Sequence, residues 1–295
     1  MWQVLGAVII WGSMFLVTKV VLDLEGVDPV LFLSVRFSIA FLCFFPILLQ
    51  ARKKYGIGKL NAKARLVPAI SGGVCLTAAY LTQAYGILAT TVPNAAFLSS
   101  VYVLFAPLLT IAILRKAVNK NEWSGALSAI IGTVVLAGFS TDIDYRASIL
   151  LLACSFFYAC QIVAVSGRDK TLPSAIFSGQ QMFVVALLTT LVLLIAPFFG
   201  RPPSMDALGD WRFILGVLYS GIIGSAIAFW LQTSGQDKVS ATQTAIIFAL
   251  EPVFATALST LVLNDIPDSA AAFGGLLIVL GVFISLLPAD EDASI

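Results

Sequence analysis

Long uninterrupted apolar segments constrain this chain more than any other feature of its sequence. The runs at 148–165 and 270–287, for example, each approach the roughly 20 residues that an α-helix needs to cross a bilayer. Hydrophobic residues make up 59% of the 295 residues and charged residues only 11%, whereas an ordinary soluble domain has roughly 25% charged residues. A soluble fold of this length would lack the polar surface to cover itself. The sequence therefore predicts an all-α integral membrane protein.

The apolar sequence divides into ten expected spans at breaks of Gly, Pro and charged residues. We expect transmembrane helices at residues 3–22, 29–49, 66–88, 92–114, 121–140, 147–166, 173–199, 211–234, 239–263 and 268–287. The loops on one side carry twelve Lys and Arg residues, and those on the opposite side only three. The positive-inside rule therefore predicts a protein of the cytoplasmic (inner) membrane with both termini in the cytoplasm. The first segment lacks a preceding basic region, so we expect a retained span and not a signal peptide.

The chain also contains an internal repeat. Identical pairs share one ungapped register with an offset of 149 residues, among them Gln83 with Gln232, Gly86 with Gly235, Ala96 with Ala245, Ala106 with Ala255, Leu109 with Leu258, Gly125 with Gly274 and Gly132 with Gly281. Each unit holds five spans, an odd number, so the second unit enters the membrane from the opposite side. The sequence thus predicts two inverted five-helix repeats, 1–142 and 143–288, followed by a short acidic cytoplasmic tail at 289–295. Transporters often use this architecture, with a site near the bilayer midplane.

Four segments carry a resemblance to a known family. They are WGSMFLVTK at 11–19, RFSIAFLCFFP at 36–46, TTVPNAAFLSSVYVLFAP at 90–107 and ALEPVFATALSTLVLND at 249–265. The chain resembles the drug/metabolite transporter (DMT) superfamily and, more narrowly, its ten-span EamA-type members, over about residues 3–287. This resemblance implies a secondary transporter, frequently an exporter of amino acids and other metabolites, without a nucleotide-binding domain. The chain departs from the family at Leu263, Asn264 and Asp265, where Leu-Gly-Glu is usual, so any charge role there is altered.

Charged side chains within the apolar segments are the first functional candidates, because a charge at the centre of a membrane helix costs about 2.5–3.5 kcal/mol on insertion scales. Glu251 lies about twelve residues into its span and is followed by Pro252. Proline cannot donate a backbone hydrogen bond and disfavours helical geometry at the preceding residue, so we expect a kinked, opened helix beside this carboxylate. Such a position suits a proton or substrate site. The alternative is a structural carboxyl that holds the two halves together through a hydrogen bond or through Arg36.

Arg36 is the second charged candidate, seven residues into its span. It either reaches the outer headgroups, pairs inside the bundle or takes part in transport. The repeat register slips near the start of each half, where Arg36 corresponds to Gln181 and Trp11 to Tyr158.

Polar residues of the fourth helix of each repeat form a further candidate group. Tyr102 takes the place of Glu251 in the first repeat, and we expect a helix kink at Pro107, a little over one turn later. Asn94 and Gln243 lie eight residues before Tyr102 and Glu251, on nearly the same helical face. These side chains either present a polar stripe to a central cavity or cap and link helix ends.

Aromatic and amide side chains complete the candidates. Four aromatic residues either line a cavity suited to flat or apolar substrates or lie at membrane interfaces and in packed cores: Tyr80, Trp230, Trp11 and Tyr158. Gln181 is an uncharged polar group within a span, and hydrogen bonding between helices is the commonest use of such a group.

We therefore expect a secondary transporter that exports a small metabolite, an amino acid or a related amphipathic compound, by alternating access, with protons as a candidate coupling ion. An uncoupled facilitator, an exchanger or an importer of the same fold are alternatives, and a channel or a membrane-embedded enzyme is more remote. The chain has no His, and its four Cys lack metal or disulfide spacing, so we expect no enzyme activity, cofactor or metal site. The net charge of +1 does not suggest nucleic acid. The expected partners are a small-molecule substrate and the lipid bilayer, and the oligomeric state is left open.

Overall fold

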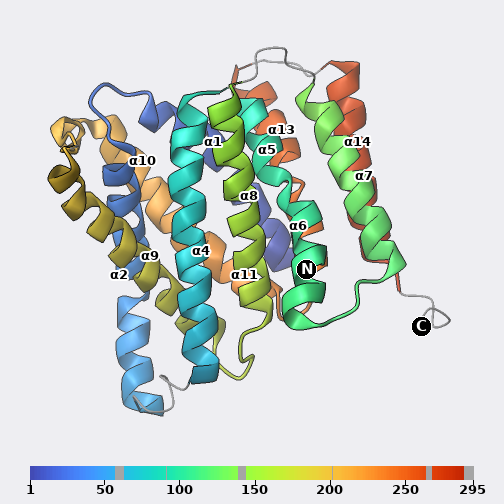
Figure 1. Cartoon of the computed structure of the whole chain (residues 1–295), viewed down its shortest axis with the longest axis horizontal. Coiled ribbons are helices and arrows are strands. Elements are labelled where there is room, and N and C mark those ends of the chain that lie inside the picture. The colour runs from blue at the N-terminus through green and yellow to red at the C-terminus, as the bar shows by residue number, and fades with distance from the viewer. Residues whose placement is uncertain (57–62, 91, 139–143, 201, 264–267, 289–295) are drawn as a thin grey trace.

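The computed structural model describes residues 1–56, 63–90, 92–138, 144–200, 202–263 and 268–288, and these residues form helices without a strand. The α-helices are α1 (Trp2–Leu22), α2 (Pro29–Tyr55), α4 (Lys63–Leu88), α5 (Val92–Ser100), α6 (Tyr102–Leu109), α7 (Lys120–Ala137), α8 (Tyr145–Ser166), α9 (Ser174–Ile195), α10 (Trp211–Gly221), α11 (Ala228–Gly235), α12 (Ala241–Phe248), α13 (Glu251–Leu263) and α14 (Ser269–Ser285). Two π-helical stretches, η1 (Thr110–Leu114) and η4 (Ile222–Ile227), and two short 3₁₀ turns, η2 (Ala196–Phe199) and η3 (Asp206–Gly209), lie between them. The helices run roughly side by side in a bundle (Figure 1). The expected acidic tail at 289–295 lies outside the described residues, as do Asn264 and Asp265.

Eight stretches of the described chain are long and apolar enough to cross a membrane. They are Trp2–Leu22, Pro29–Tyr55, Arg65–Leu88, Asn94–Leu114, Tyr145–Ser166, Ser174–Phe199, Trp211–Gly235 and Ala241–Leu258. The other two expected spans correspond to α7, which has Lys120 and Glu122 in its first turn, and to α14, an apolar helix of 17 residues. The structure therefore has the helices of an integral membrane protein, and the number of ten spans stays a prediction.

Polar caps at the loops explain where several helices begin. The Asp28 carboxylate accepts hydrogen bonds from the backbone nitrogens of Val30 and Leu31, which satisfies donors that have no partner inside α2. Capping boxes begin α7, at Asn119 and Glu122, and α12, at Ser240 and Gln243. The Ser240 hydroxyl also donates to the buried Glu122 carboxylate, which ties the starts of these two helices together.

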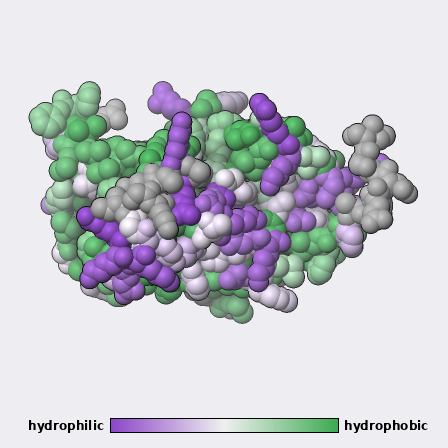
Figure 2. Space-filling model, turned by 90° about the horizontal axis from the view of Figure 1, so that it is seen from below, coloured by the Kyte–Doolittle hydropathy of each residue, from purple (hydrophilic) through white to green (hydrophobic). Residues whose placement is uncertain are grey.

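The connections between helices lie on two opposite faces of the molecule, and contacts between segments identify each face. On one face, Arg65 pairs with Asp169 at 2.9 Å, Lys170 donates to the Asp237 carbonyl at 3.1 Å, and Asn121 donates to the Pro288 carbonyl at 2.8 Å. Hydrophilic side chains gather on this end of the molecule (Figure 2). On the other face, the loop at Gly26 lies against the loop at 204–206.

Glycines allow α7 and α14 to lie backbone against backbone, side by side in Figure 1. A Cβ atom at Gly125 would lie 2.6 Å from the Gly281 carbonyl oxygen, and one at Gly132 would lie 2.6 Å from the Gly274 carbonyl oxygen. Only small residues allow membrane helices to approach this closely. Between these contacts, the Ser128 hydroxyl donates to the Leu277 carbonyl at 2.8 Å.

Candidate functional site

Two membrane helices are broken near their middle. In the first half, α5 ends at Ser100 and α6 begins at Tyr102; in the second half, α12 ends at Phe248 and α13 begins at Glu251. The residues between them, Val101 and 249–250, are separated by the same offset of 149 residues that relates the repeats. Discontinuous helices at corresponding positions of two halves are the best structural pointer to a transport site.

Proline explains one of these breaks directly. Pro252 cannot donate to the Phe248 carbonyl, and it disfavours helical geometry at Glu251, so the helix opens where the sequence indicates. The other break falls at Val101, before Tyr102. Pro107 lies inside α6 and is followed by the π-helical stretch η1, so the first-half break precedes the expected kink by about one and a half helical turns.

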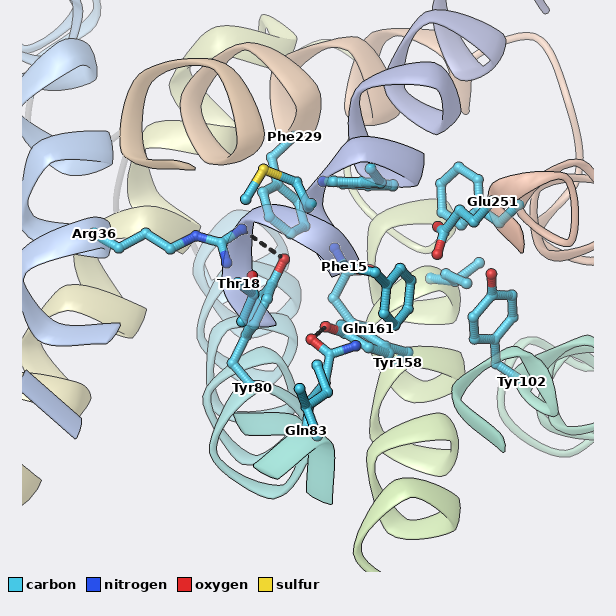
Figure 3. A pocket seen from close by; sticks show the side chains of 15 residues that line it. Phe15, Thr18, Arg36, Tyr80, Gln83, Tyr102, Tyr158, Gln161, Phe229 and Glu251 are labelled. Atoms are coloured by element: carbon cyan, nitrogen blue, oxygen red, sulfur yellow. Dashed lines mark hydrogen bonds between the residues drawn. The ribbon is translucent and has the colours of Figure 1, made fainter. Parts of the chain in front are cut away.

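Tyr102 and Glu251, the first residues after the breaks, line a cavity with a volume of about 50 Å³. This volume accommodates a few water molecules. Fifteen side chains from α1, α2, α4, α6, α8, α11, α12 and α13 line the cavity: Trp11, Met14, Phe15, Thr18, Arg36, Tyr80, Gln83, Ile87, Tyr102, Tyr158, Gln161, Ile162, Phe229, Phe248 and Glu251. Both halves of the chain therefore contribute to its wall (Figure 3).

Six of the fifteen lining residues are aromatic rings in edge-to-face contact with other rings: Trp11, Tyr80, Tyr102, Tyr158, Phe229 and Phe248. The Trp11 ring lies 5.0 Å from Phe229 and 4.9 Å from Phe248 between ring centroids. The Tyr80 ring lies 5.5 Å from Tyr158. Each such contact adds about 0.5–1.5 kcal/mol beyond its buried area. The cavity therefore has closely packed, largely apolar walls.

Arg36 reaches this cavity from α2, and only 2% of its surface is exposed. Its Nε donates to the Ser225 hydroxyl at 2.8 Å, and its Nη2 donates to the Tyr80 hydroxyl at 3.3 Å and the Gly224 carbonyl at 3.4 Å. The guanidinium carbon lies 4.7 Å from the centre of the Tyr80 ring, within the range of a cation–π interaction. The Arg36 side chain is thus held in place by neutral groups.

The backbone acceptor for Arg36 comes from the π-helical stretch η4, which interrupts the expected span at 211–234. Its Gly224 carbonyl accepts from Trp11 Nε1 at 3.0 Å as well as from Arg36. A π-helical turn changes the hydrogen-bond spacing of the backbone, and such turns occur frequently at functional sites. Two cavity side chains are therefore fixed by one irregular backbone segment.

Glu251 lies on the opposite side of the cavity from Arg36 (Figure 3) and is 9% exposed. The Tyr102 hydroxyl lies close to it in the same view and has no hydrogen-bond partner within the described ranges. Neither Arg36 nor Glu251 forms an ion pair with the residues that the structure describes. The structure therefore does not contain the ion pair between Arg36 and Glu251 that was the alternative role for this carboxyl.

Four sequence candidates lie outside the cavity wall. Gln243 caps α12 and donates to the Ser285 carbonyl at 3.0 Å, and Asn94 donates to the Thr90 hydroxyl at 3.3 Å, so both serve helix ends. Trp230 is 40% exposed, and its neighbour Phe229 lines the cavity instead, because adjacent helix residues point about 100° apart. Gln181 is fully buried behind the cavity, where its side-chain oxygen accepts from Gln161 at 3.2 Å.

Sequence reasoning did not select several polar residues of the site. Gln83 accepts a hydrogen bond from the Tyr158 hydroxyl at 3.0 Å, and Gln161 lines the cavity and exchanges hydrogen bonds with Gln232. Gln161 is the one amide in the apolar run at 148–165, which is the signal that would have identified it. Among the described residues, no group of three or more His, Cys, Asp or Glu side chains could hold a metal ion.

Comparison with known proteins places this geometry in a family context. A family model described as "EamA-like transporter family" matches the chain twice, over residues 1–138 and 146–287. A solved crystal structure superposes with a TM-score of 0.76 at 20% identity, covering 97% of this chain and 95% of its own, which indicates a shared fold.

Three similar proteins carry transporter names. An uncharacterized transporter of Archaeoglobus fulgidus is 31% identical, over 94% of this chain and 82% of its own length. An S-adenosylmethionine uptake transporter of Rickettsia prowazekii is 27% identical, over 92% and 89% of the two chains. A probable amino-acid metabolite efflux pump of Escherichia coli is 22% identical, over 95% and 92%.

Proposed function

Because this chain belongs to the EamA-like transporter family, we propose that it is a secondary transporter that exports a small amphipathic metabolite, such as an amino acid or a related compound, by alternating access. The observation that carries the proposal is the cavity, which both halves line and which lies beside the two helix breaks. A cavity of about 50 Å³ is too small for an amino acid. The lining side chains would therefore separate when a substrate enters, as a rocking motion of the two halves would allow.

Contacts between α7 and α14 support the inverted repeat on which such a motion depends. Gly125 contacts Gly281, and their repeat counterparts, Gly274 and Gly132, contact each other in the same way. Ser128 donates to the carbonyl of its own repeat counterpart. A two-fold relation produces this pattern, in which paired contacts exchange and a residue near the axis meets its own equivalent.

The cavity wall follows the same relation. Trp11 corresponds to Tyr158 in the slipped register, and Tyr80 corresponds to Phe229 at the offset of 149 residues. The ring contact of Trp11 with Phe229 therefore has its counterpart in the contact of Tyr158 with Tyr80. These matched contacts support a pseudo-two-fold axis near the cavity, where the substrate site of an inverted-repeat transporter lies.

The proposal places ten spans in the cytoplasmic (inner) membrane, with α7 and α14 as the fifth and tenth. The loops rich in Lys and Arg, including those at Arg65 and Lys170, lie on one face of the molecule. Met1 and Leu286 border one surface hollow beside Lys238, which puts both ends of the described chain on that face. The positive-inside rule assigns this face to the cytoplasm.

Glu251 is the candidate group for proton coupling, because it is the acidic side chain at the cavity and begins a broken helix. The names of the relatives include both an uptake transporter and an efflux pump, so transport direction is decided by experiment. Uncoupled facilitation, exchange and import remain the alternatives to coupled export in this fold.

Flux into and out of proteoliposomes tests this function. Purified protein is assayed with labelled amino acids and amphipathic amines, with and without a pH gradient, beside Glu251→Gln. Glu25→Gln is the matched control, because it makes the same chemical change in an exposed loop. We expect wild type and Glu25→Gln to accumulate the same compound class when a gradient is applied.

The behaviour of Glu251→Gln separates the alternatives. Loss of gradient-driven accumulation with exchange retained supports proton coupling through this carboxyl. Equal flux in both proteins makes Glu251 structural and favours uncoupled facilitation. If folded wild-type protein moves no compound of a broad panel, the transporter proposal is wrong.

A further inference from the structure

We infer that Arg36 is the anion-binding group of the cavity, and that the transported molecule carries a single carboxylate beside an apolar or aromatic body. The inference rests on the proposed transport function, and it adds the charge and shape of the substrate. It starts from the hydrogen bonds that Arg36 makes and from those that it lacks.

The Arg36 guanidinium has unused hydrogen-bond donors at the cavity. An arginine side chain offers five N–H donors in a planar fork. Nε and Nη2 bind Ser225, Tyr80 and Gly224, whereas Nη1 forms no hydrogen bond with any residue that the structure describes. The side chain is almost fully buried and lines the cavity. Two donors of a buried cation are thus available to a molecule that enters.

The charge of Arg36 is also uncompensated in this part of the protein. Every acceptor that holds it is neutral, and it forms no ion pair within the described ranges. Buried charges in proteins are normally paired, because an unpaired charge in a low-dielectric interior is unfavourable. Arg168 illustrates the usual arrangement, since its buried guanidinium pairs with Asp237 at 2.7 Å. A carboxylate brought by the substrate would supply the missing partner for Arg36.

The Arg36 guanidinium is held in a fixed position before any ligand binds, which indicates that it recognises a ligand as well as anchoring α2. Ser225 and Gly224 fix one edge of the guanidinium from behind, and the Tyr80 ring covers its face. The two N–H donors of Nη1 are left for a carboxylate, which can accept a charge-assisted hydrogen bond from this nitrogen. Anchoring alone would not require a vacant pair of donors at a cavity.

The remaining wall defines the rest of the substrate. One guanidinium matches one negative charge, and the opposite side of the cavity carries Glu251, which offers no positive charge to a second anionic group (Figure 3). The rings of Trp11, Phe229 and Phe248 also line the cavity. These rings suit an aromatic or aliphatic body. Monocarboxylates and zwitterionic amino acids with large apolar side chains meet both conditions, whereas dicarboxylates and amines without an acid group do not.

Matched acid and amide pairs test this inference in wild-type protein. The probes are L-phenylalanine with L-phenylalaninamide, L-leucine with L-leucinamide, and 3-phenylpropionate with 3-phenylpropionamide, assayed by flux or by competition in proteoliposomes. Each pair differs at the carboxyl group alone. We expect the acid of a pair to be preferred about 10- to 100-fold, which is the range for a hydrogen bond to a charged group.

Variants of Arg36 assign the preference to this residue. Arg36→Gln should reduce the acid-to-amide ratio to near one, and Arg36→Lys should keep part of it, because lysine retains the charge but not the planar fork. The ratio is measured within each protein, so it does not depend on the amount that folds. Arg212→Gln removes an arginine that is paired with Asp210 on the surface, and it should leave the ratio unchanged.

The outcomes distinguish this inference from the transport proposal. If acids and amides move equally well in wild type, or if Arg36→Gln keeps the wild-type ratio, transport stands and the anion site is wrong. If Arg36→Gln does not fold, the wild-type pairs and Arg36→Lys decide the question. If no member of any pair is moved or competes while another compound of the broad panel is transported, this substrate inference is wrong and transport stands; if the broad panel fails as well, the proposed function is wrong.

Discussion

Adjacent glycines in α14 provide a sharp test of the helix contacts on which the two-fold arrangement depends. A Cβ atom at Gly274 would lie 2.6 Å from the Gly132 carbonyl oxygen and 2.8 Å from Leu136 Cα, both backbone atoms that cannot move alone. At Gly275 the nearest atom to a new Cβ is Leu136 Cδ1 at 3.6 Å, an ordinary van der Waals contact. Both Gly→Ala changes gain about 0.5–1 kcal/mol of helix propensity. Gly274→Ala alone adds steric overlap, which costs about 1–3 kcal/mol.

The difference between Gly274→Ala and Gly275→Ala therefore isolates the overlap, and we expect about 1–3 kcal/mol less stability for Gly274→Ala. Unfolding of both purified variants in the same detergent measures this difference. Gly125→Ala, at the repeat counterpart of Gly274, should behave in the same way, because its Cβ would lie 2.6 Å from the Gly281 carbonyl oxygen. Equal stability of the two α14 variants would refute the close contact. A loss at Gly274 without one at Gly125 would refute the two-fold relation between these helices.

Two ion pairs on the face that carries Arg65 and Lys170 give further predictions. Hydrogen bonds from Thr171 and then the Arg65 guanidinium lower the pKa of Asp169 to about 2, below its ordinary value of about 4. Asp169→Asn should therefore lower the unfolding temperature at pH 7, and this difference should disappear as the pH falls from about 4 to about 2; a difference that persists at pH 2 would contradict the assignment. Asp237→Asn leaves the Arg168 guanidinium, 2% exposed, without its partner. Because Asp237 is 33% exposed, we expect a loss of about 1–2 kcal/mol in thermal unfolding, and an unchanged stability would contradict a structural role for this pair.

Much of the cavity could be predicted because charges and polar rings are costly in lipid. Arg36, Glu251 and Tyr102 stand out in apolar segments, and the structure brings all three to one cavity. Trp11 and Tyr158 line it as well. The family resemblance, carried by the motifs around these residues, is confirmed by the family match over both halves.

The parts that could not be predicted depend on helix rotation and on backbone irregularity. Trp230 and Phe229 are both aromatic, and lipid accepts a Trp side chain as readily as a cavity does, so composition cannot decide which one faces inward. Amide side chains serve equally in caps and in cavities; Gln243 belongs to a capping box, and Asn94 donates to the Thr90 hydroxyl just before α5. In the π-helical stretch at Gly224 the backbone hydrogen bonds span one more residue than in an α-helix, and the residue pattern of the sequence does not reveal this change.

In the proposed inverted repeat, the charges of the cavity differ between the halves although the aromatic contacts of its wall recur. Under the repeat relation, Arg36 corresponds to the neutral Gln181 and Glu251 to the neutral Tyr102, while the aromatic contacts recur in both halves. Matched walls would let the two halves exchange conformations without a large difference in packing, which is what alternating access requires. An unmatched cation on one side and an acid on the other would give an asymmetric substrate one preferred orientation in both states. We therefore expect exchange of the two charges, in Arg36→Glu with Glu251→Arg, to impair recognition of the same acids even where the double variant folds.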